Sequence, residues 1–340
     1  MPLLDGTVHG SPRVRRTLVG IAMSVLFLAL ALSGQDFGAV WSTLKNAEYW
    51  YVVPAVALYF AGVWIRAARW SLLLQGLRPV RSMDLFPLVV IGYMANNVLP
   101  LRAGEFVRAY ALSAQMGVRK TAGLTTIALE RLFDGLTMLG FMVVASLSVA
   151  LTSPVRHLAL VTGVLFVPLL VGLAVASDGR VRDHLMRRVV PGLPQRVRER
   201  AERTVHSITL GLSILQRRRE LAAVAVTSLA AWLFEASTYL VVAKVFDLQL
   251  SVMVVLLTTA VANLATLIPS SPGYVGPFEA GVLLVVAGVA GISREVALSY
   301  ALVLHAVLYL PVTAWGLLFW WRESLLWRDV RRASVEEAAS

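Results

Sequence analysis

Charged and polar side chains interrupt an otherwise apolar stretch of the sequence, MANNVLPLRAGEFVRAY. Asn96 and Asn97 come just before a proline, and Arg102, Glu105 and Arg108 follow at intervals of three residues. Residues three apart are neighbours on a helix, so we expect adjacent members of this charged trio to pair along one face. Two arginines against one carboxylate leave a positive excess, and guanidinium groups fit phosphate oxygens well. The stretch therefore predicts a binding site for an anionic headgroup.

Proline and glycine in the same stretch predict that the chain reverses direction there. Pro100 removes a backbone donor, and Gly104 permits a close turn. We expect the tip of a helical hairpin, with the charged trio on its return arm. An alternative is that Arg108 extends to the membrane surface and only Arg102 and Glu105 are buried.

A second stretch, ANLATLIPSSPGYVGPFE, repeats the order of residues in the first. Both begin with Ala-Asn, reach a proline, have a glycine four residues after it and end at a glutamate. In the second stretch the glycine is Gly273 and the glutamate is Glu279. Ser270, Ser271 and Tyr274 supply hydroxyl groups that could bind a headgroup or cap broken helix ends. We interpret the two stretches as an internal repeat.

Three charged residues lie close together in the run ALERLFDGL. Glu130 and Asp134 share one helix face, and Arg131 can pair with Asp134. The two acids could respond to protons or serve as counterions for Arg102 or Arg108. A structural salt bridge between helices is the competing interpretation.

Two further titratable side chains lie alone in apolar runs. Glu235 needs a partner, and Arg66 or Arg69 could supply it, unless these arginines extend to the membrane surface. His305 is expected to be a hydrogen-bonded interior histidine or a member of a proton relay.

The composition is that of a polytopic membrane protein. Of 340 residues, 58% are hydrophobic and 15% are charged, with a mean hydropathy of +0.72; soluble domains have about 25% charged residues. The absence of cysteine excludes disulfides, thiolate metal sites and a cysteine nucleophile. The net charge of +11 gathers in the connecting loops, which indicates membrane topology and not nucleic-acid binding. We expect no metal site and no cofactor.

Apolar runs predict an all-α fold with about six membrane-spanning helices. The expected spans are roughly 17–34, 50–74, 121–150, 157–177, 221–246 and 296–321. The first could instead be a signal peptide. The interrupted stretches 84–113 and 250–291 are expected to be re-entrant helical hairpins.

Arginine and lysine near the span ends predict the orientation. These basic residues all lie on the cytoplasmic side if 84–113 enters and leaves the membrane from the cytoplasm, and if 250–291 enters and leaves it from outside. Both termini are then cytoplasmic. The single domain, 1–340, then contains an inverted repeat of about 50–150 and 221–321. Such repeats are typical of alternating-access transporters.

The loop 178–220 is the most basic part of the chain. Its apolar residues recur at helical spacing beside arginines, as in an amphipathic helix on an anionic lipid surface. A solvated cytoplasmic loop is the alternative.

Taken together, NNVLPLRAGEFVRAYALS, ALERLFDG and PSSPGYVGPFEAG resemble the lysylphosphatidylglycerol synthase transmembrane region family from about residue 15 to 322. The resemblance implies a flippase-like domain that moves a lipid or lipid-linked headgroup between leaflets. The residues at the matching motif positions are Arg102, Glu105, Arg108, Glu130, Arg131, Asp134, Pro269, Gly273 and Glu279. Because the chain ends at Ser340, soon after the last expected span, we expect no synthase domain.

We expect a transporter in the cell membrane that moves an anionic phospholipid, an aminoacyl-lipid or a polyprenyl-phosphate-linked sugar, without catalytic residues. No nucleotide phosphate-binding loop occurs in the sequence. A homo-oligomer is compatible with the sequence. One alternative is a membrane lipid transferase with Glu105, Glu130 or Asp134 as base. Another is a non-catalytic scaffold whose basic face binds anionic lipid or a partner enzyme.

Overall fold

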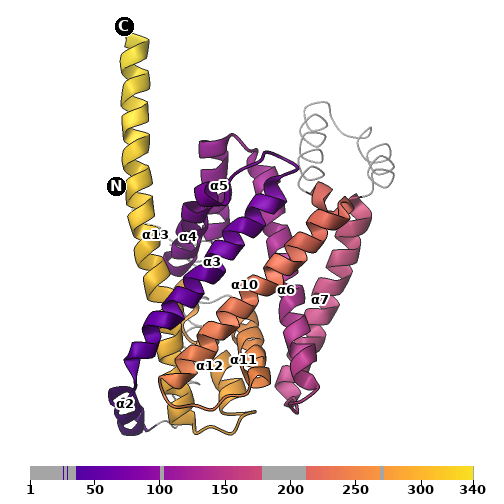
Figure 1. The fold of residues 1–340 in the computed structure, drawn as a ribbon, viewed down its shortest axis with the longest axis vertical. Coiled ribbons are helices and arrows are strands. Elements are labelled where there is room, and N and C mark those ends of the chain that lie inside the picture. The colour runs from indigo at the N-terminus through magenta and orange to yellow at the C-terminus, as the bar shows by residue number, and fades with distance from the viewer. Residues whose placement is uncertain are drawn as a thin grey trace, which may run out of the picture.

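The computed structural model describes residues 36–99, 103–177, 212–268 and 272–339, together with Leu26 and Ala29. All the regular secondary structure in these residues is helical (Figure 1). The predictions for Arg102, Ser270 and Ser271, for nearly all of 17–34 and for most of the 178–220 loop fall outside the described residues.

Two long helices, α3 (Val52–Leu74) and α10 (Arg218–Lys244), pack along one another through the centre of the molecule (Figure 1). They approach closely at Gly62, where an added Cβ would lie 3.2 Å from the carbonyl oxygen of Ala231. Small residues at such crossings let helix backbones come together. This contact sets the position of the buried charges on both helices.

Four helical segments in the described part of the chain are long and apolar enough to cross a membrane. They cover Tyr49–Leu74, Ser153–Leu173, Arg218–Lys244 and Arg294–Arg322. The first segment includes η1 (Tyr49–Tyr51); the second and fourth lie in α7 (Ser153–Ser177) and α13 (Arg294–Ala339). These segments match four of the predicted spans, so the chain has an all-α, polytopic membrane fold.

The run predicted to span 121–150 forms α6 (Lys120–Ser146). Its 27 residues give a length of about 40 Å, which exceeds the hydrocarbon thickness. Glu130, Arg131 and Asp134 lie in the middle of this helix. The charges are turned inward, since Glu130 and Asp134 are both buried. That α6 crosses the membrane stays a prediction from the sequence.

Each interrupted stretch folds as a pair of packed helices. The first pair is α4 (Ser82–Val98) with α5 (Gly104–Met116), and the second is α11 (Val252–Ala265) with α12 (Pro277–Val286). The second pair lies below the first in Figure 1. The hairpins are therefore present, and their re-entrant, oppositely oriented insertion in a membrane stays a prediction.

The two hairpins are shaped by glycine and proline. An added Cβ at Gly104 would lie 1.9 Å from the carbonyl oxygen of Gly92, so α4 and α5 can meet only without side chains there. In the second hairpin, η5 (Pro272–Tyr274) contains Gly273 with φ +78°, and Pro277 starts α12. The positive φ suits glycine, and proline suits the first turn of a helix.

Helix α13 contacts the tips of both hairpins. Asn97 at the end of α4 donates a 2.8 Å hydrogen bond to the hydroxyl oxygen of Thr313. The Tyr309 hydroxyl donates to the Asn97 carbonyl oxygen over 3.3 Å. The ring of Tyr309 also packs on Gly273, where an added Cβ would lie 2.6 Å from Cε2. A single turn of α13 thus holds both tips.

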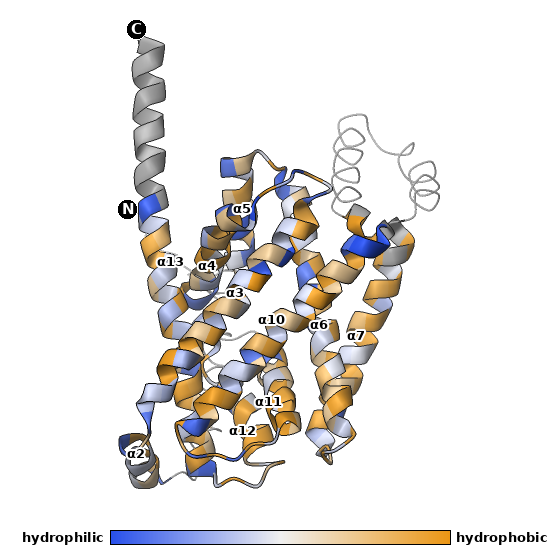
Figure 2. Cartoon of the chain, viewed as in Figure 1, coloured by the Kyte–Doolittle hydropathy of each residue, from blue (hydrophilic) through white to orange (hydrophobic). Residues whose placement is uncertain are grey.

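The outer surface is apolar over much of its area. Helix α7 is hydrophobic along most of its length in Figure 2, and it exposes large apolar side chains such as Val161, Val164 and Leu165. The short helix α2 (Phe37–Lys45), capped by Asp36, exposes an aromatic side chain at Trp41. These surfaces suit contact with lipid.

Candidate functional site

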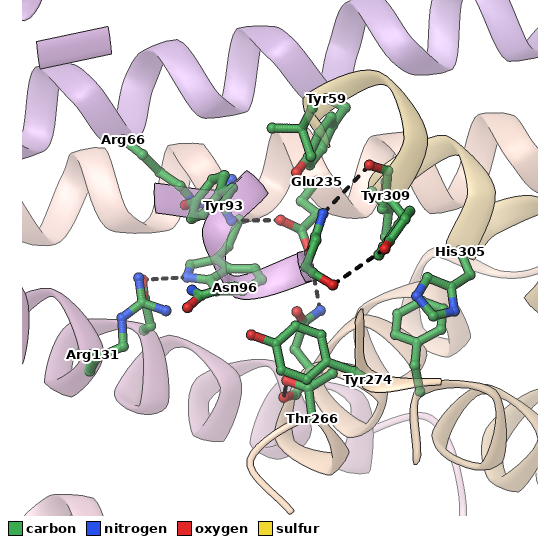
Figure 3. A pocket seen from close by; sticks show the side chains of 17 residues that line it. Tyr59, Arg66, Tyr93, Asn96, Arg131, Glu235, Thr266, Tyr274, His305 and Tyr309 are labelled. Atoms are coloured by element: carbon green, nitrogen blue, oxygen red, sulfur yellow. Dashed lines mark hydrogen bonds and ion pairs between the residues drawn. The ribbon is translucent and has the colours of Figure 1, made fainter. Parts of the chain in front are cut away.

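A cavity of about 130 Å³ lies where the hairpin tips meet α3, α6, α10 and α13 (Figure 3). This volume can hold several water molecules. The lining residues are Tyr59, Arg66, Tyr93, Asn96, Asn97, Arg131, Asp134, Trp232, Glu235, Asn263, Thr266, Tyr274, Phe278, His305, Leu308, Tyr309 and Val312. The cavity combines charged, amide and aromatic side chains inside an apolar molecule.

One buried ion pair in the cavity wall joins α3 to α10. Arg66 Nη2 lies 2.6 Å from Glu235 Oε2, and both side chains are buried. The other carboxylate oxygen, Oε1, accepts a 3.2 Å hydrogen bond from Asn263 Nδ2. The Arg66 guanidinium lies over the Trp232 ring, 4.5 Å from its centroid. The predicted partnership of Glu235 with an arginine of the second span is confirmed, and Arg66 does not extend to the membrane surface.

Asp134 on α6 accepts two hydrogen bonds at Oδ1 and forms an ion pair at Oδ2. Arg69 Nη1 lies 2.7 Å from Oδ1, and Trp232 Nε1 donates to the same oxygen over 2.8 Å. Arg131 Nη2 lies 3.1 Å from Oδ2, which confirms the predicted pairing within α6. Arg69 also donates to the Ser228 hydroxyl. Two arginines therefore share one carboxylate, which holds α3, α6 and α10 together.

The charged residues of α5 pair with α6. Arg108 Nη1 lies 2.8 Å from Glu130 Oε2, and the Arg108 guanidinium lies over the Trp70 ring. Glu105 lies 3.8 Å from Arg131. The predicted pairing of Glu105 with Arg108 along one helix face is thus replaced by pairing across to α6. The alternative in which Arg108 reaches the membrane surface is wrong, because its side chain is 3% exposed.

The positive excess predicted for the first hairpin depends on Arg102, which lies outside the described residues, so it stays a prediction. Four arginines and four carboxylates form the network of α3, α5, α6 and α10. These side chains are Arg66, Arg69, Arg108, Arg131, Glu105, Glu130, Asp134 and Glu235. Neutrality is the expected result because an uncompensated charge in the interior of a membrane is costly.

Hydrogen-bonding capacity nevertheless remains in the cavity wall. Arg66 Nη1, Arg131 Nε and Asp134 Oδ2 are buried and have no hydrogen-bond partner in the described structure, and Arg131 Nε lies 3.8 Å from Glu105 Oε1. A buried donor without a partner costs about 1–3 kcal/mol, and more on a charged group. Both arginines line the cavity, so an anion with several oxygens could satisfy these donors.

The second hairpin tip is held by a histidine. His305 Nδ1 lies 2.5 Å from Glu279 Oε1, and Nε2 lies 2.8 Å from the Gly273 carbonyl oxygen. The other oxygen of Glu279 accepts a 2.6 Å hydrogen bond from the Gly276 backbone N–H, at the start of α12. The prediction of a hydrogen-bonded interior histidine is confirmed. Figure 3 shows His305 beside the cavity, across from Tyr274.

The two asparagines of the first tip have separate roles. Asn96 Oδ1 accepts a 2.8 Å hydrogen bond from the Gly104 backbone N–H and so caps α5. Asn97 binds Thr313 of α13 instead. Both side chains line the cavity, and both also stabilise the hairpin tip.

Some of the predicted site residues line the cavity, and others lie outside the lining. Those in the wall are Asn96, Asn97, Arg131, Asp134, Glu235, Tyr274 and His305. Those outside the lining are Glu105, Arg108, Glu130, Gly273 and Glu279. The second group supports the wall through ion pairs and hydrogen bonds. In the described part of the chain, no three acidic or histidine side chains come together to hold a metal ion.

Several cavity residues were not predicted from the sequence. The aromatic ones are Tyr59, Tyr93, Trp232, Phe278 and Tyr309, and the polar ones are Asn263 and Thr266. Asn263 had a signal that could have identified it, because it follows alanine in the second copy of the repeat as Asn96 does in the first. The aromatic residues had none, since an aromatic side chain in an apolar helix can face protein, lipid or a cavity equally well.

Known proteins are similar in sequence to this chain over most of its length. The chain is 29% identical over 333 residues to "Glycosyltransferase AglD" of Haloferax volcanii, a match that covers 87% of this chain and 53% of that protein. The chain thus spans about half the length of that relative. It is 24% identical over 314 residues to a "UPF0104 membrane protein" of Methanothermobacter thermautotrophicus, with 87% of this chain and 92% of that protein covered.

No solved structure matches the chain significantly. Residues 17–316 match the family described as "Lysylphosphatidylglycerol synthase TM region". This range includes both hairpins and every residue that lines the cavity. The resemblance seen in the three sequence motifs is confirmed, and the chain belongs to the lysylphosphatidylglycerol synthase transmembrane region family.

Proposed function

We propose that this protein is a lipid transporter that passes an anionic headgroup between leaflets through the cavity at the hairpin tips. The observation that carries the proposal is the pair of cavity arginines, Arg66 and Arg131, each with a buried guanidinium nitrogen that has no hydrogen-bond partner. A phosphate group has enough oxygens to bind these donors, and a cavity in an apolar molecule gives it a path across hydrocarbon. The lipid tails stay outside, in the membrane.

The arginines of the cavity wall can exchange their carboxylate partners for the phosphate during transport. An entering phosphate competes with Glu235 for Arg66 and with Asp134 for Arg131, and the carboxylates pair with the arginines again when the headgroup leaves. The arginines then have a counterion in both states, which lowers the cost of keeping them in the membrane. Opposed hairpins on either side of one site are the arrangement used in alternating access.

The lining favours a headgroup with polar groups besides the phosphate. Asn263, Thr266 and Tyr274 add amide and hydroxyl groups to the cavity wall. Phospholipids, aminoacyl-lipids and polyprenyl-phosphate-linked sugars all fit this description. We further propose that the protein lies in the cell membrane with both termini in the cytoplasm, as the positions of arginine and lysine predict.

The proposal is tested by leaflet exchange in proteoliposomes of phosphatidylcholine and phosphatidylglycerol with a trace of fluorescent phosphatidylglycerol. Arg131→Gln should abolish protein-dependent exchange, because it removes one of the two arginine charges in the cavity wall. Arg156→Gln on the exposed face of α7 is the matched control and should exchange like the wild type. Excess inorganic phosphate tests whether the site recognises a lipid headgroup or any free phosphate. Inhibition of exchange by phosphate would mean that the site binds phosphate without a lipid attached. Equal exchange by wild type and Arg131→Gln would refute the role of the cavity.

A membrane-bound transferase is the second candidate function. The observation that favours it is the name of the Haloferax relative, a glycosyltransferase of which this chain covers 53%. In the described structure Glu105, Glu130 and Asp134 are each ion-paired with arginine, so a base role would require one pair to open. Purified protein incubated with a sugar-phosphate lipid and an acceptor lipid, and analysed by mass spectrometry, would reveal a transferase by a new product.

A further inference from the structure

We propose that Glu279 and His305 form a proton-binding site that couples the binding of an anionic headgroup in the cavity to the uptake of one proton. The proposal rests on the proposed lipid transport and adds a second ligand to it. The site joins two elements that carry the second hairpin tip, α12 and α13.

The hydrogen-bond geometry requires one proton in this pair. His305 Nε2 faces the carbonyl oxygen of Gly273, which can only accept, so the hydrogen on Nε2 is committed there. His305 Nδ1 and Glu279 Oε1 are 2.5 Å apart, and two lone pairs at that distance would repel each other. One further proton must lie between them, whichever of the two atoms carries it. The remaining oxygen of Glu279 is already occupied by the Gly276 backbone N–H.

The charge of the surrounding network leads independently to the same conclusion. The four arginines and four carboxylates of α3, α5, α6 and α10 sum to zero. The Glu279–His305 pair is neutral when it holds the proton and carries one negative charge without it. The described network is therefore neutral only in the protonated state, which is the favoured state in an apolar interior.

The pair is close enough to the cavity to sense a bound anion. His305 lines the cavity itself, and its ring packs against Phe278 and Tyr309, which also line it. The other titratable or charged side chains that face the cavity from α3, α4, α6, α10, η5 and α13 are Tyr59, Arg66, Tyr93, Arg131, Asp134, Glu235, Tyr274 and Tyr309.

Linkage sets the direction of the coupling. A phosphate in the cavity adds negative charge, which favours the protonated pair, and by reciprocity the protonated pair favours phosphate binding. Loss of the proton leaves a negative charge that repels the headgroup, and it removes the hydrogen bond between Glu279 of α12 and His305 of α13. Headgroup and proton thus bind together, and the proton comes from water that enters the cavity.

The experiment compares leaflet exchange of fluorescent phosphatidylglycerol at about pH 6 and about pH 8, with equal pH on both sides of the proteoliposome membrane. The wild-type rate should fall as the pH rises, by up to about tenfold per pH unit, the limit for one coupled proton. Glu279→Gln should be insensitive to pH, because its amide can donate to Nδ1 and accept from Gly276 without an added proton. It should exchange at pH 8 at the rate of the wild type at pH 6.

Two more variants complete the test. His305→Gln removes the ring that shares the proton with Glu279 and should also abolish the pH dependence, whatever its absolute rate. His157→Gln, an exposed histidine on α7, is the matched control and should retain the wild-type pH dependence. Exchange by the wild type at one rate at both pH values would overturn proton coupling and leave the proposed transport intact. An unchanged pH dependence in Glu279→Gln and His305→Gln would overturn the site, whereas no exchange at any pH would remove the proposed function and the coupling together.

Discussion

Arg66 on α3 and Glu235 on α10, 169 positions apart in sequence, form a buried ion pair of 2.6 Å in the wall of the cavity. The pair joins the two central helices and presents the Arg66 guanidinium to the space where a headgroup would bind. It therefore has a structural and a functional role, and substitutions can separate the two.

We predict that Glu235→Gln destabilises the protein strongly, because Arg66 then stays buried without a counterion. Removal of one partner from a buried ion pair costs about 3–5 kcal/mol. The double substitution Arg66→Met with Glu235→Leu should recover most of this loss, because neither charge remains. Unfolding in detergent, followed by tryptophan fluorescence, measures both. The double variant should still be inactive in leaflet exchange, and normal exchange would show that Arg66 does not bind the headgroup.

The Arg108–Glu130 pair is a buried ion pair that lies outside the cavity lining, so we expect it to have a structural role alone. It is as deeply buried as the first pair, but neither residue lines the cavity. We predict that Arg108→Met with Glu130→Leu folds and retains a large part of wild-type exchange, whereas Glu130→Gln alone loses about 3–5 kcal/mol of stability. Exchange and unfolding are measured as before. If the double variant folds but loses exchange completely, Arg108 belongs to the transport path.

The sequence allowed much of the helical architecture to be predicted, since long apolar runs in a membrane have few alternatives to a helix. The partners of buried charges were partly predictable for a related reason, because such charges need counterions. Arg131 and Asp134 are three residues apart on one helix, so their contact follows from helix geometry alone. For Glu235 the sequence left two candidate partners, Arg66 and Arg69, because both lie in the apolar span 50–74.

Contacts that depend on how helices pack against one another could not be predicted from the sequence. Glu105, Arg108 and Arg131 were all recognised as charged members of the motifs, but their choice of partners depends on the crossing of α5 and α6. The cavity wall shows the same limit. Tyr59 and Tyr93 face the cavity because of the rotation of α3 and α4, and a single sequence does not encode that rotation in a readable pattern.

The close packing of the first hairpin gives a further prediction. At Gly104 an added Cβ would lie 1.9 Å from the Gly92 carbonyl oxygen, so Gly104→Ala must push α4 and α5 apart. We expect a loss of about 1–3 kcal/mol, as for other overpacked sites. Gly140→Ala on α6 is the matched control, because its Cβ would meet no atom within 4 Å. It should add about 0.5–1 kcal/mol through its higher helix propensity. Equal thermal stability of the two variants would contradict the tight contact.

The absence of cysteine makes the orientation directly measurable, because a single introduced cysteine is labelled without background. Gln75 and Gln249 are exposed, and they lie beyond the ends of α3 and α10, which run in opposite directions along one another (Figure 1). On intact cells, a membrane-impermeant maleimide should label Gln249→Cys and leave Gln75→Cys unlabelled, because the arginine-rich side is expected to face the cytoplasm.

The same experiment tests the first hairpin. Ala114 is exposed near the end of α5, and Ala114→Cys should be protected together with Gln75→Cys if 84–113 returns to the side from which it entered. Labelling of all three after permeabilisation shows that each cysteine is reactive. Labelling of Ala114→Cys on intact cells while Gln75→Cys stays unlabelled would mean that 84–113 crosses the membrane once, and the inverted repeat would have to be abandoned. Labelling of Gln75→Cys and Ala114→Cys but not of Gln249→Cys would reverse the orientation and keep the hairpin, since the arginines would then face outside.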